Sequence, residues 1–181
     1  MVSKMTARLT VPVSERDHVQ GSPDDAVTLV EYGDFECPHC GAAHQVVKQI
    51  QKALGDQLRF VFRHFPLTQM HPHAERAAEA AEAAGAQGRF WQMHDLLFEH
   101  QQSLSDSHLL LYAEAIDLDT DRFARELAEG VHQPRVREDF MSGVRSGVNG
   151  TPTFFINGVR HDGPFDLSAL LYAIQRAGSN V

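Results

Sequence analysis

The chain has 181 residues, of which 43% are hydrophobic, and its two cysteines are Cys37 and Cys40. This length suits one domain, or one domain with an insertion, and excludes two separate large domains. Two cysteines also exclude a secreted scaffold held together by several disulfides. The formal net charge of −8, with acidic and basic residues interspersed, argues against nucleic acid as a partner.

The N-terminal region carries no recognisable targeting signal. Met1 to Gln20 contains Lys4 and Arg8 but no uninterrupted apolar stretch of about 7 residues. No run in the chain approaches the roughly 20 apolar residues that cross a bilayer. We therefore predict no membrane insertion and, from the chain as written, a cytoplasmic protein. Removal of a leader would instead indicate a periplasmic or other extracytoplasmic protein.

The first third of the chain predicts an arm followed by a β-α-β unit. Residues 1–26 are polar and rich in turn residues, which indicates an arm with one short strand at Arg8 to Val11. The β-branched and aromatic residues of Val27 to Tyr32 predict a strand. A helix from Pro38 to Leu54 follows from its apolar spacing and its early proline. Alternating apolar residues predict a second strand from Leu58 to Phe65.

Residues 72–146 are predicted to be almost entirely helical. Alanine and glutamate dominate the first part of this stretch, and apolar residues recur at helical spacing in the rest. Asp106 and Asp119 are candidate N-caps of two of these helices. We interpret the stretch as a compact helical insertion.

The C-terminal part returns to β structure. A strand at Thr153 to Ile156, a two-residue turn at Asn157-Gly158 and a returning strand at Val159 to His161 predict a hairpin. A last helix is predicted from Asp166, its N-cap, to Gly178. The element order indicates an α/β protein with a thioredoxin fold and an inserted α-helical domain. The expected parts are an N-terminal arm (1–26), the thioredoxin-like core (27–71 and 147–181) and the inserted helical domain (72–146).

Cys37-Pro38-His39-Cys40 places two sulfur atoms at the predicted junction between a strand and a helix. Cys37 at the N-cap faces unpaired backbone N–H groups and the positive end of the helix dipole, which favour the thiolate. We therefore predict that Cys37 is the attacking sulfur and that Cys40, one turn inside the helix, is the resolving one. A protonated His39 beside the thiolate would lower the Cys37 pKa further and make the disulfide oxidising.

Three structural alternatives use the same two cysteines. A zinc site needs four ligands, and His71 and His73 do not have the usual ligand spacing. A four-cysteine iron–sulfur cluster would require two chains. A structural disulfide that closes so small a loop stabilises little. The redox pair explains the placement of the cysteines better, and it requires no metal or bound cofactor.

Two positions far from the cysteine pair are candidates for its chemistry. A cis peptide before Pro152 would present the free backbone groups of Thr151 to an extended peptide, although an ordinary trans loop proline is the alternative. Glu31 shares a predicted strand face with Val27 and Leu29, where an acid is costly unless it has a role. We predict a buried Glu31 with a raised pKa that exchanges protons with Cys40 through water. The alternative is an edge-strand acid that faces solvent.

The remaining histidines and aromatic residues have simpler interpretations. His64, His94 and His100 are predicted at the surface or in the compact helical insertion. Phe90, Trp91 and Met93 are candidates for a peptide-binding surface, but we predict that they are core, because an aromatic stripe at helical spacing is more often buried.

The Cys37-Pro38-His39-Cys40 motif, preceded by Val30-Glu31-Tyr32 and followed after the helical stretch by Gly150-Thr151-Pro152-Thr153-Phe154, resembles the DsbA family of thiol-disulfide oxidoreductases. The resemblance is to the DsbA-like thioredoxin-domain subgroup and covers roughly residues 21–178. It implies a helical domain inserted after the second core strand, Cys37 as nucleophile, Cys40 as resolving cysteine and Pro152 in cis. By position, Glu31 resembles the family's buried acid near the resolving cysteine.

The resemblance implies an enzyme that exchanges disulfides with protein or peptide thiols, and the Pro38-His39 pair implies a dithiol oxidase. A separate redox partner would reset the cysteine pair. We expect a monomer, because residues 1–26 cannot supply the dimerisation domain of the related isomerases. Two other functions stay open. One is a kappa-class glutathione transferase or related isomerase, which generally has serine at the position of Cys37, and the other is a zinc-holding or inert binding module.

Overall fold

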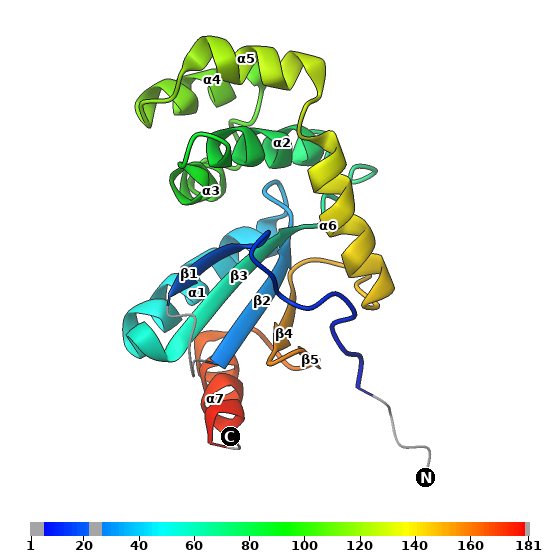
Figure 1. The fold of residues 1–181 in the computed structure, drawn as a ribbon. Coiled ribbons are helices and arrows are strands. Elements are labelled where there is room, and N and C mark those ends of the chain that lie inside the picture. Colours follow the sequence, from blue (N-terminus) through cyan, green and yellow to red (C-terminus); the bar gives the residue numbers. More distant parts are fainter. Residues whose placement is uncertain (1–5, 22–26, 180–181) are drawn as a thin grey trace.

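A computed structural model describes residues 6–21 and 27–179 and contains a five-stranded mixed sheet in the order β1-β3-β2-β4-β5. The central strands β2 and β3 are parallel, and the other neighbouring pairs are antiparallel. The strands are β1 (His18–Gly21), β2 (Val27–Gly33), β3 (Leu58–His64), β4 (Thr153–Ile156) and β5 (Val159–His161). This mixed sheet and the helices around it confirm the predicted α/β thioredoxin fold (Figure 1).

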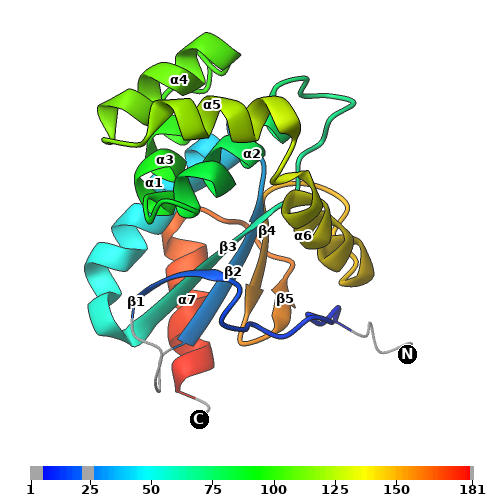
Figure 2. The same cartoon turned by 45° about the horizontal axis from the view of Figure 1, so that its top comes forward.

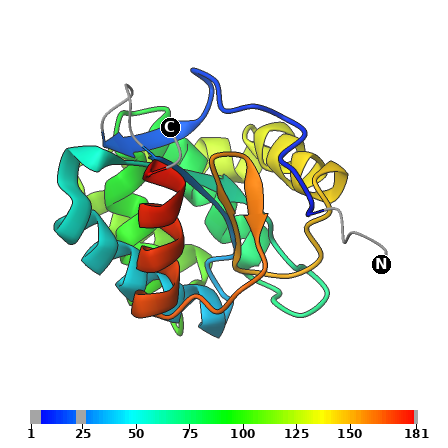
Figure 3. The same cartoon turned by 90° about the horizontal axis from the view of Figure 1, so that it is seen from below.

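Helices cover both faces of the sheet and extend beyond one end of it. They are α1 (Pro38–Leu54, followed by a 3-10 turn at Gly55–Gln57), α2 (Ala74–Gly85), α3 (Phe90–Glu99), α4 (Asp106–Ala115), α5 (Thr120–Glu129), α6 (Gln133–Arg145) and α7 (Leu167–Gly178). In Figure 3, α7 and α1 run along one side of the sheet while α6 and the N-terminal arm lie on the other. Figure 2 shows α4 and α5 as the layer farthest from the sheet.

Strand β2 is buried on both of its faces because of this arrangement. Val27 and Leu29 belong to the larger core cluster, which α1, α3 and α7 also line. Val30 and Tyr32 point the other way into a smaller cluster that the arm and α6 cover. The end of β2 therefore holds the loop before α1 in a rigid position.

The prediction for the N-terminal arm was wrong in one respect. The expected strand at Arg8 to Val11 is reduced to a single bridge between Arg8 and Val159. The arm instead contributes β1, which pairs with β3 as an edge strand. His18 holds this strand in place, because its ring stacks on Phe90 at a centroid distance of 3.5 Å.

Two of the three predicted aspartate N-caps and the predicted hairpin turn are present in the structure. Asp119 and Asp166 accept hydrogen bonds from the backbone N–H groups of Arg122 and Ala169, as N-caps do. The prediction of Asp106 as an N-cap was wrong, since Ser105 has the extended cap conformation and Asp106 is the first helical residue. Asn157 and Gly158 both have positive φ angles, of 47° and 77°, which form the predicted tight turn.

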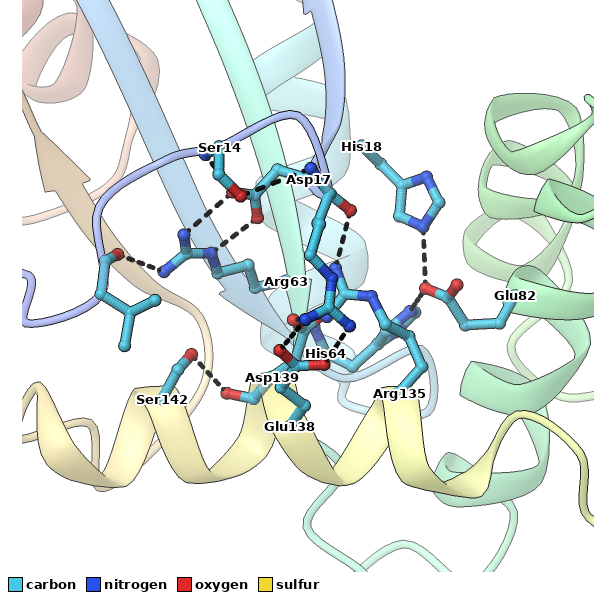
Figure 4. A network of polar contacts seen from close by, with 12 residues as sticks. Ser14, Asp17, His18, Arg63, His64, Glu82, Arg135, Glu138, Asp139 and Ser142 are labelled. Atoms are coloured by element: carbon cyan, nitrogen blue, oxygen red, sulfur yellow. Dashed lines mark hydrogen bonds and ion pairs between the residues drawn. The ribbon is translucent and has the colours of Figure 1, made fainter.

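Figure 4 shows a polar network that joins the arm, the sheet and two helices. Arg63 on β3 binds both carboxylate oxygens of Asp17, at 2.8 and 3.0 Å. The Glu82 carboxylate on α2 accepts hydrogen bonds from His64 and His18. The prediction of His64 at the surface or in the helical insertion was therefore wrong, because His64 lies on β3 with none of its surface exposed. The network fixes α2 and α6 against the sheet.

Candidate active site

The cysteine pair lies where β2 gives way to α1. Cys37 is the N-cap of α1, with an extended backbone at φ −71° and ψ 122°, and Pro38 occupies the first turn. Both cysteines are free thiols and both are buried, Cys37 with 4% and Cys40 with 0% of its surface exposed. Any exchange with another protein is therefore expected to begin at Cys37, because Cys37 keeps a small exposed surface and Cys40 has none.

The surroundings of Cys37 favour its thiolate. A hydrogen bond from the Cys40 thiol is the largest contribution, and burial opposes it. The Thr151 side chain and the backbone N–H groups of Cys40 and His39 add further stabilisation, so that the Cys37 pKa falls to about 5. At neutral pH the reduced protein therefore carries a negative charge on Cys37.

Cys40 has the opposite character. Burial raises its pKa well above that of an ordinary thiol, and the hydrogen bond to Cys37 and the charges of Glu31 and Cys37 raise it further. Cys40 is thus a proton-carrying thiol at neutral pH. The two sulfurs are chemically distinct, as an attacking and a resolving thiol would be.

The Thr151–Pro152 segment lies against Cys37 although it follows it by more than a hundred residues. The Cys37 Sγ atom lies 3.6 Å from the Thr151 carbonyl oxygen, and the peptide bond between Thr151 and Pro152 is cis. The buried Thr151 hydroxyl has no hydrogen-bond partner among the described residues, which leaves it free to donate to the thiolate. The structure thus brings both candidate substrate-binding residues to the attacking sulfur.

Glu31 is buried in the centre of the sheet rather than at an edge. It lies on β2 between Phe62 of β3 and Phe154 of β4, and only 1% of its surface is exposed. Its Oε1 atom has no hydrogen-bond partner within the part of the chain that the structure describes. Burial, and secondarily the charge of Cys37, raises the Glu31 pKa to about 8.

This buried carboxyl makes the stability of the protein depend on pH. The folded protein holds the Glu31 proton up to about pH 8, whereas the unfolded chain releases it near 4.5, so the free energy of unfolding falls as pH rises between these values. We expect Glu31→Gln to remove this decrease in the free energy of unfolding with rising pH. Its stabilisation relative to the native sequence should grow from near zero at about pH 5 to roughly 3–5 kcal/mol at about pH 9.

Urea unfolding of the reduced proteins at several pH values measures this difference. Glu75→Gln, which changes an exposed acid in the first turn of α2, is the matched control and should show no such trend. A stability difference for Glu31→Gln that stays constant with pH would contradict the raised pKa.

The remaining motif residues play smaller structural parts. Pro38 starts α1 and supplies no N–H to the turn. The His39 ring is exposed, while its backbone N–H is one of the donors that lower the Cys37 pKa. His39 therefore contributes to the site at least through its backbone.

Two acidic residues that the sequence prediction did not assign hold the loop before Cys37. Asp34 is buried, and its carboxylate accepts hydrogen bonds from the backbone of Glu36 and from the His71 ring at 2.8 Å. Glu36 accepts two hydrogen bonds from His73, at 2.7 and 2.9 Å. His71 and His73, which precede α2, thus pair with carboxylates of this loop.

Aromatic side chains pack against the same loop through Phe35. Phe35 packs against Phe62, His94 and Phe98, with ring centroids 4.8–5.7 Å apart. Of the two predicted places for His94, the helical insertion is correct and the surface is not, because His94 lies in α3 with its ring buried in this cluster. Burial lowers the His94 pKa to about 4, so the ring is neutral at pH 7. Phe90 and Met93 are buried, as predicted, whereas Trp91 is only partly buried against the same core. His100 is exposed.

Within residues 6–21 and 27–179, two groups of side chains have the composition of a metal site. They are His18, His64 and Glu82, and His44, His94 and Asp95. In the first group both imidazole Nε2 atoms bond the same Glu82 oxygen, at 2.8 and 2.7 Å, which are hydrogen-bond distances. A metal-binding histidine normally donates its second ring N–H, yet the buried His64 Nδ1 has no partner among the described residues. The first group therefore fits a set of hydrogen bonds to Glu82 better than a metal centre.

The second group is already paired without a metal. Asp95 accepts hydrogen bonds from His94 at 2.9 Å and from Lys48 at 2.5 Å. Burial alone would raise the Asp95 pKa, but these two donors outweigh it and lower the pKa to about 2. The carboxylate is thus neutralised by Lys48, which a metal ligand would not require.

Both the sequence and the structure of the chain are similar to those of known proteins. A family model described as thioredoxin matches residues 13–176. The structure of BdbD from Bacillus subtilis aligns with a TM-score of 0.85 at 22% identity, covering 96% of this chain and 97% of that one. A thioredoxin-like oxidoreductase from Silicibacter pomeroyi aligns with a TM-score of 0.80 at 28% identity, covering 92% and 94%. α-DsbA1 from Wolbachia pipientis aligns with a TM-score of 0.79 at 23% identity, covering 95% of each chain.

Similar sequences also occur within much longer proteins. The chain is 51% identical over 177 residues to Na⁺/H⁺ antiporter NhaA 1 of Salinispora arenicola, which covers 97% of this chain and 27% of that protein. The chain therefore spans about a quarter of the length of such relatives. Among the helices of residues 6–21 and 27–179, none has the length and apolar character needed to cross a membrane.

Proposed function

The chain belongs to the thioredoxin family, and on this premise we propose that it is a DsbA-like enzyme that exchanges disulfides with protein or peptide thiols, as a dithiol oxidase. The observation that carries the proposal is the pair of sulfurs with opposite character at the start of α1. Cys37 has a lowered pKa and lies beside Thr151, whereas Cys40 has a raised pKa and is fully buried. A metal or inert site would not need this difference.

The oxidative reaction requires only the two cysteines and a dithiol substrate. A substrate thiolate attacks Cys37 of the Cys37–Cys40 disulfide, and the sulfur of Cys40 leaves with the electron pair and takes up a proton. A second substrate thiolate then attacks the substrate sulfur of the mixed disulfide, and Cys37 leaves as a thiolate. The substrate loses two electrons and gains a disulfide, while the protein gains two electrons and becomes the dithiol form. A separate oxidising partner must then restore the disulfide.

The environment of each sulfur supports the roles in this reaction. Cys37 is a good leaving group because its thiolate is stabilised. Cys40 needs a proton when it leaves. Glu31 is a buried carboxyl that still holds a proton at neutral pH, and it is close enough to Cys40 for its ionised form to raise the Cys40 pKa. The Thr151 backbone beside Cys37 supplies polar groups for an extended substrate peptide.

The relatives named as antiporters do not change this proposal. The match to them covers a quarter of their length, and we assign thiol chemistry to the part that corresponds to this chain. We do not extend sodium–proton exchange to it. A thiol-exchange unit of this kind would act on thiols of other proteins or of a polypeptide to which it is joined.

The direct test mixes the oxidised protein with a reduced peptide that contains two cysteines. We expect one peptide disulfide to form for each protein disulfide consumed, measured by mass spectrometry and by titration of free thiols. The control is the protein reduced beforehand, which should leave the peptide unchanged. No peptide oxidation, together with one zinc ion per chain or glutathione transfer to a small electrophile, would refute the proposal and favour a binding module or a transferase.

A further inference from the structure

Gln101 joins the helical stretch to the loop that carries the attacking cysteine. It lies in the turn after α3, and its Nε2 atom donates hydrogen bonds to the carbonyl oxygens of Phe35 and Cys37, both at 2.8 Å. An amide NH₂ group has two hydrogens, so these two bonds use its full donor capacity. The carbonyls belong to residues on both sides of Glu36, which the amide therefore spans.

The Cys37 carbonyl is the point at which the helix begins. It also accepts the first intrahelical hydrogen bond of α1, from the backbone N–H of Gly41 at 3.1 Å. Because this carbonyl has two partners, the peptide plane after Cys37 has a fixed orientation. The next N–H groups in the turn, from His39 and Cys40, are the ones that stabilise the Cys37 thiolate. Fixing the carbonyl therefore fixes the direction of these donors.

Gly41 provides independent evidence for the same contact. A Cβ atom at position 41 would lie 2.2 Å from Gln101 Oε1 and 2.8 Å from its Cδ atom, closer than van der Waals contact allows. Glycine weakens a helix relative to alanine, so its presence one residue after Cys40 calls for a reason. The Gln101 amide occupies the space that any larger residue would need.

We propose that Gln101 is a positioning residue of the candidate active site, whose amide is seated against Gly41 and holds the Phe35 and Cys37 carbonyls so that the first turn of α1 faces the attacking sulfur. The effect of the Gln101 contact on catalysis rests on the proposed function. The contact itself does not, because the Cys37 pKa and the stability of α1 can be measured whether or not the protein is an enzyme.

The first test measures the Cys37 thiolate in Gln101→Met, which keeps the length of the side chain and removes the donor. Without the two hydrogen bonds, the N–H groups of the turn are less often aligned with the sulfur. We therefore expect the Cys37 pKa to rise by about one unit, which is a roughly tenfold decrease in the acid dissociation constant of the thiol. Thiolate absorbance against pH provides the measurement. The neighbouring Gln102 is exposed and makes no side-chain hydrogen bond in the described part of the chain, so Gln102→Met is the matched control. An unchanged pKa in Gln101→Met would overturn the proposal.

The second test is a double-mutant cycle that does not involve the thiol. Gly41→Ala alone should lower the urea midpoint, because its methyl group collides with the Gln101 amide. In a Gln101→Ala background the same change should raise the midpoint, because alanine favours the helix and the obstacle is gone. If Gly41→Ala fails to fold alone, recovery of folding in the double variant supports the contact. An equal loss of stability in both backgrounds would overturn it.

These tests are separate from the test of the proposed function. If the native protein does not oxidise dithiols but both variants behave as expected, the positioning role stands and the enzymatic proposal fails. If the native protein oxidises dithiols while Gln101→Met keeps the native Cys37 pKa and the cycle shows no coupling, the positioning role fails alone.

Discussion

Replacing Cys37 with serine will abolish disulfide exchange, whereas replacing Cys40 with serine will stop the exchange at a mixed disulfide on Cys37. Cys37 is the sulfur with the lowered pKa and the contact to Thr151, so its loss removes the atom that a substrate thiolate must reach. Cys40 has no exposed surface and cannot substitute for it. We expect peptide oxidation by Cys37→Ser to fall by at least about three orders of magnitude, to the uncatalysed background.

The Cys40→Ser variant separates attack from resolution. Serine retains a hydroxyl that can donate to Cys37, so the thiolate persists while the resolving sulfur is absent. With oxidised glutathione, the reduced variant should accumulate one glutathione adduct on Cys37, visible by mass spectrometry, and release it only when an external thiol is added. The two serine variants are matched controls for each other. Residual exchange by Cys37→Ser, or adduct formation by Cys37→Ser but not by Cys40→Ser, would contradict the assigned roles.

Replacing Arg63 with methionine will cause the largest expected loss of stability. The Arg63 and Asp17 side chains are 3% and 4% exposed, and Arg63 also donates to the Tyr32 hydroxyl at 2.9 Å. Burial alone would raise the Asp17 pKa, but the hydrogen bonds from Arg63 and the Ser14 backbone outweigh it and lower the pKa. Removing Arg63 leaves the buried Asp17 carboxylate without its paired cation, so we expect a loss of about 3–5 kcal/mol in urea unfolding at neutral pH.

An exposed pair of the same chemistry provides the control for Arg63. Arg16 and Glu138 form two hydrogen bonds of 2.7 Å, but their side chains are 67% and 45% exposed. Arg16→Met should therefore cost less than about 1 kcal/mol. Adding Asp17→Asn to Arg63→Met should recover part of the loss, because the buried charge disappears. Equal costs for Arg63→Met and Arg16→Met would show that burial does not determine the strength of these pairs.

The Arg63 pair also has a defined pH dependence. Because the folded-state pKa of Asp17 lies below its unfolded value of 3.8, its contribution to stability is present above that value and is lost as the pH falls below it. The difference between the native sequence and Arg63→Met should therefore shrink in acid.

Local patterns in the sequence were sufficient to predict the elements that carry the cysteine pair. Strand β2 and helix α1 have strong residue preferences and clear start and stop signals, and Pro38 marks the first turn of α1. The Asn157-Gly158 turn follows from two adjacent residues that tolerate positive φ. These features depend on neighbours in the chain, so a single sequence contains the information.

The errors concern contacts between residues that are distant in the sequence. The residues of strand β1 show no strong β-strand pattern, and the strand forms because it pairs with the edge of β3. His64 and His94 are polar residues whose burial depends on helices α2 and α3 covering them. Gln101 follows Cys37 by 64 residues and belongs to no motif, so only the folded chain reveals its contact. The nearest sequence signal was Gly41, a glycine early in a predicted helix.

The equilibrium between the protein and glutathione tests the central claim most directly. Thioredoxin and DsbA combine thiol pKa values of about 7 and about 3.5 with reduction potentials of about −270 and about −120 mV. One pKa unit of thiolate stabilisation corresponds to about 30 mV for a two-electron couple. With a Cys37 pKa of about 5, this protein lies between the two. We predict a potential of roughly −190 mV, that of an oxidising disulfide. A potential at or below about −270 mV would contradict the claim that thiolate stabilisation at Cys37 makes the pair a dithiol oxidase.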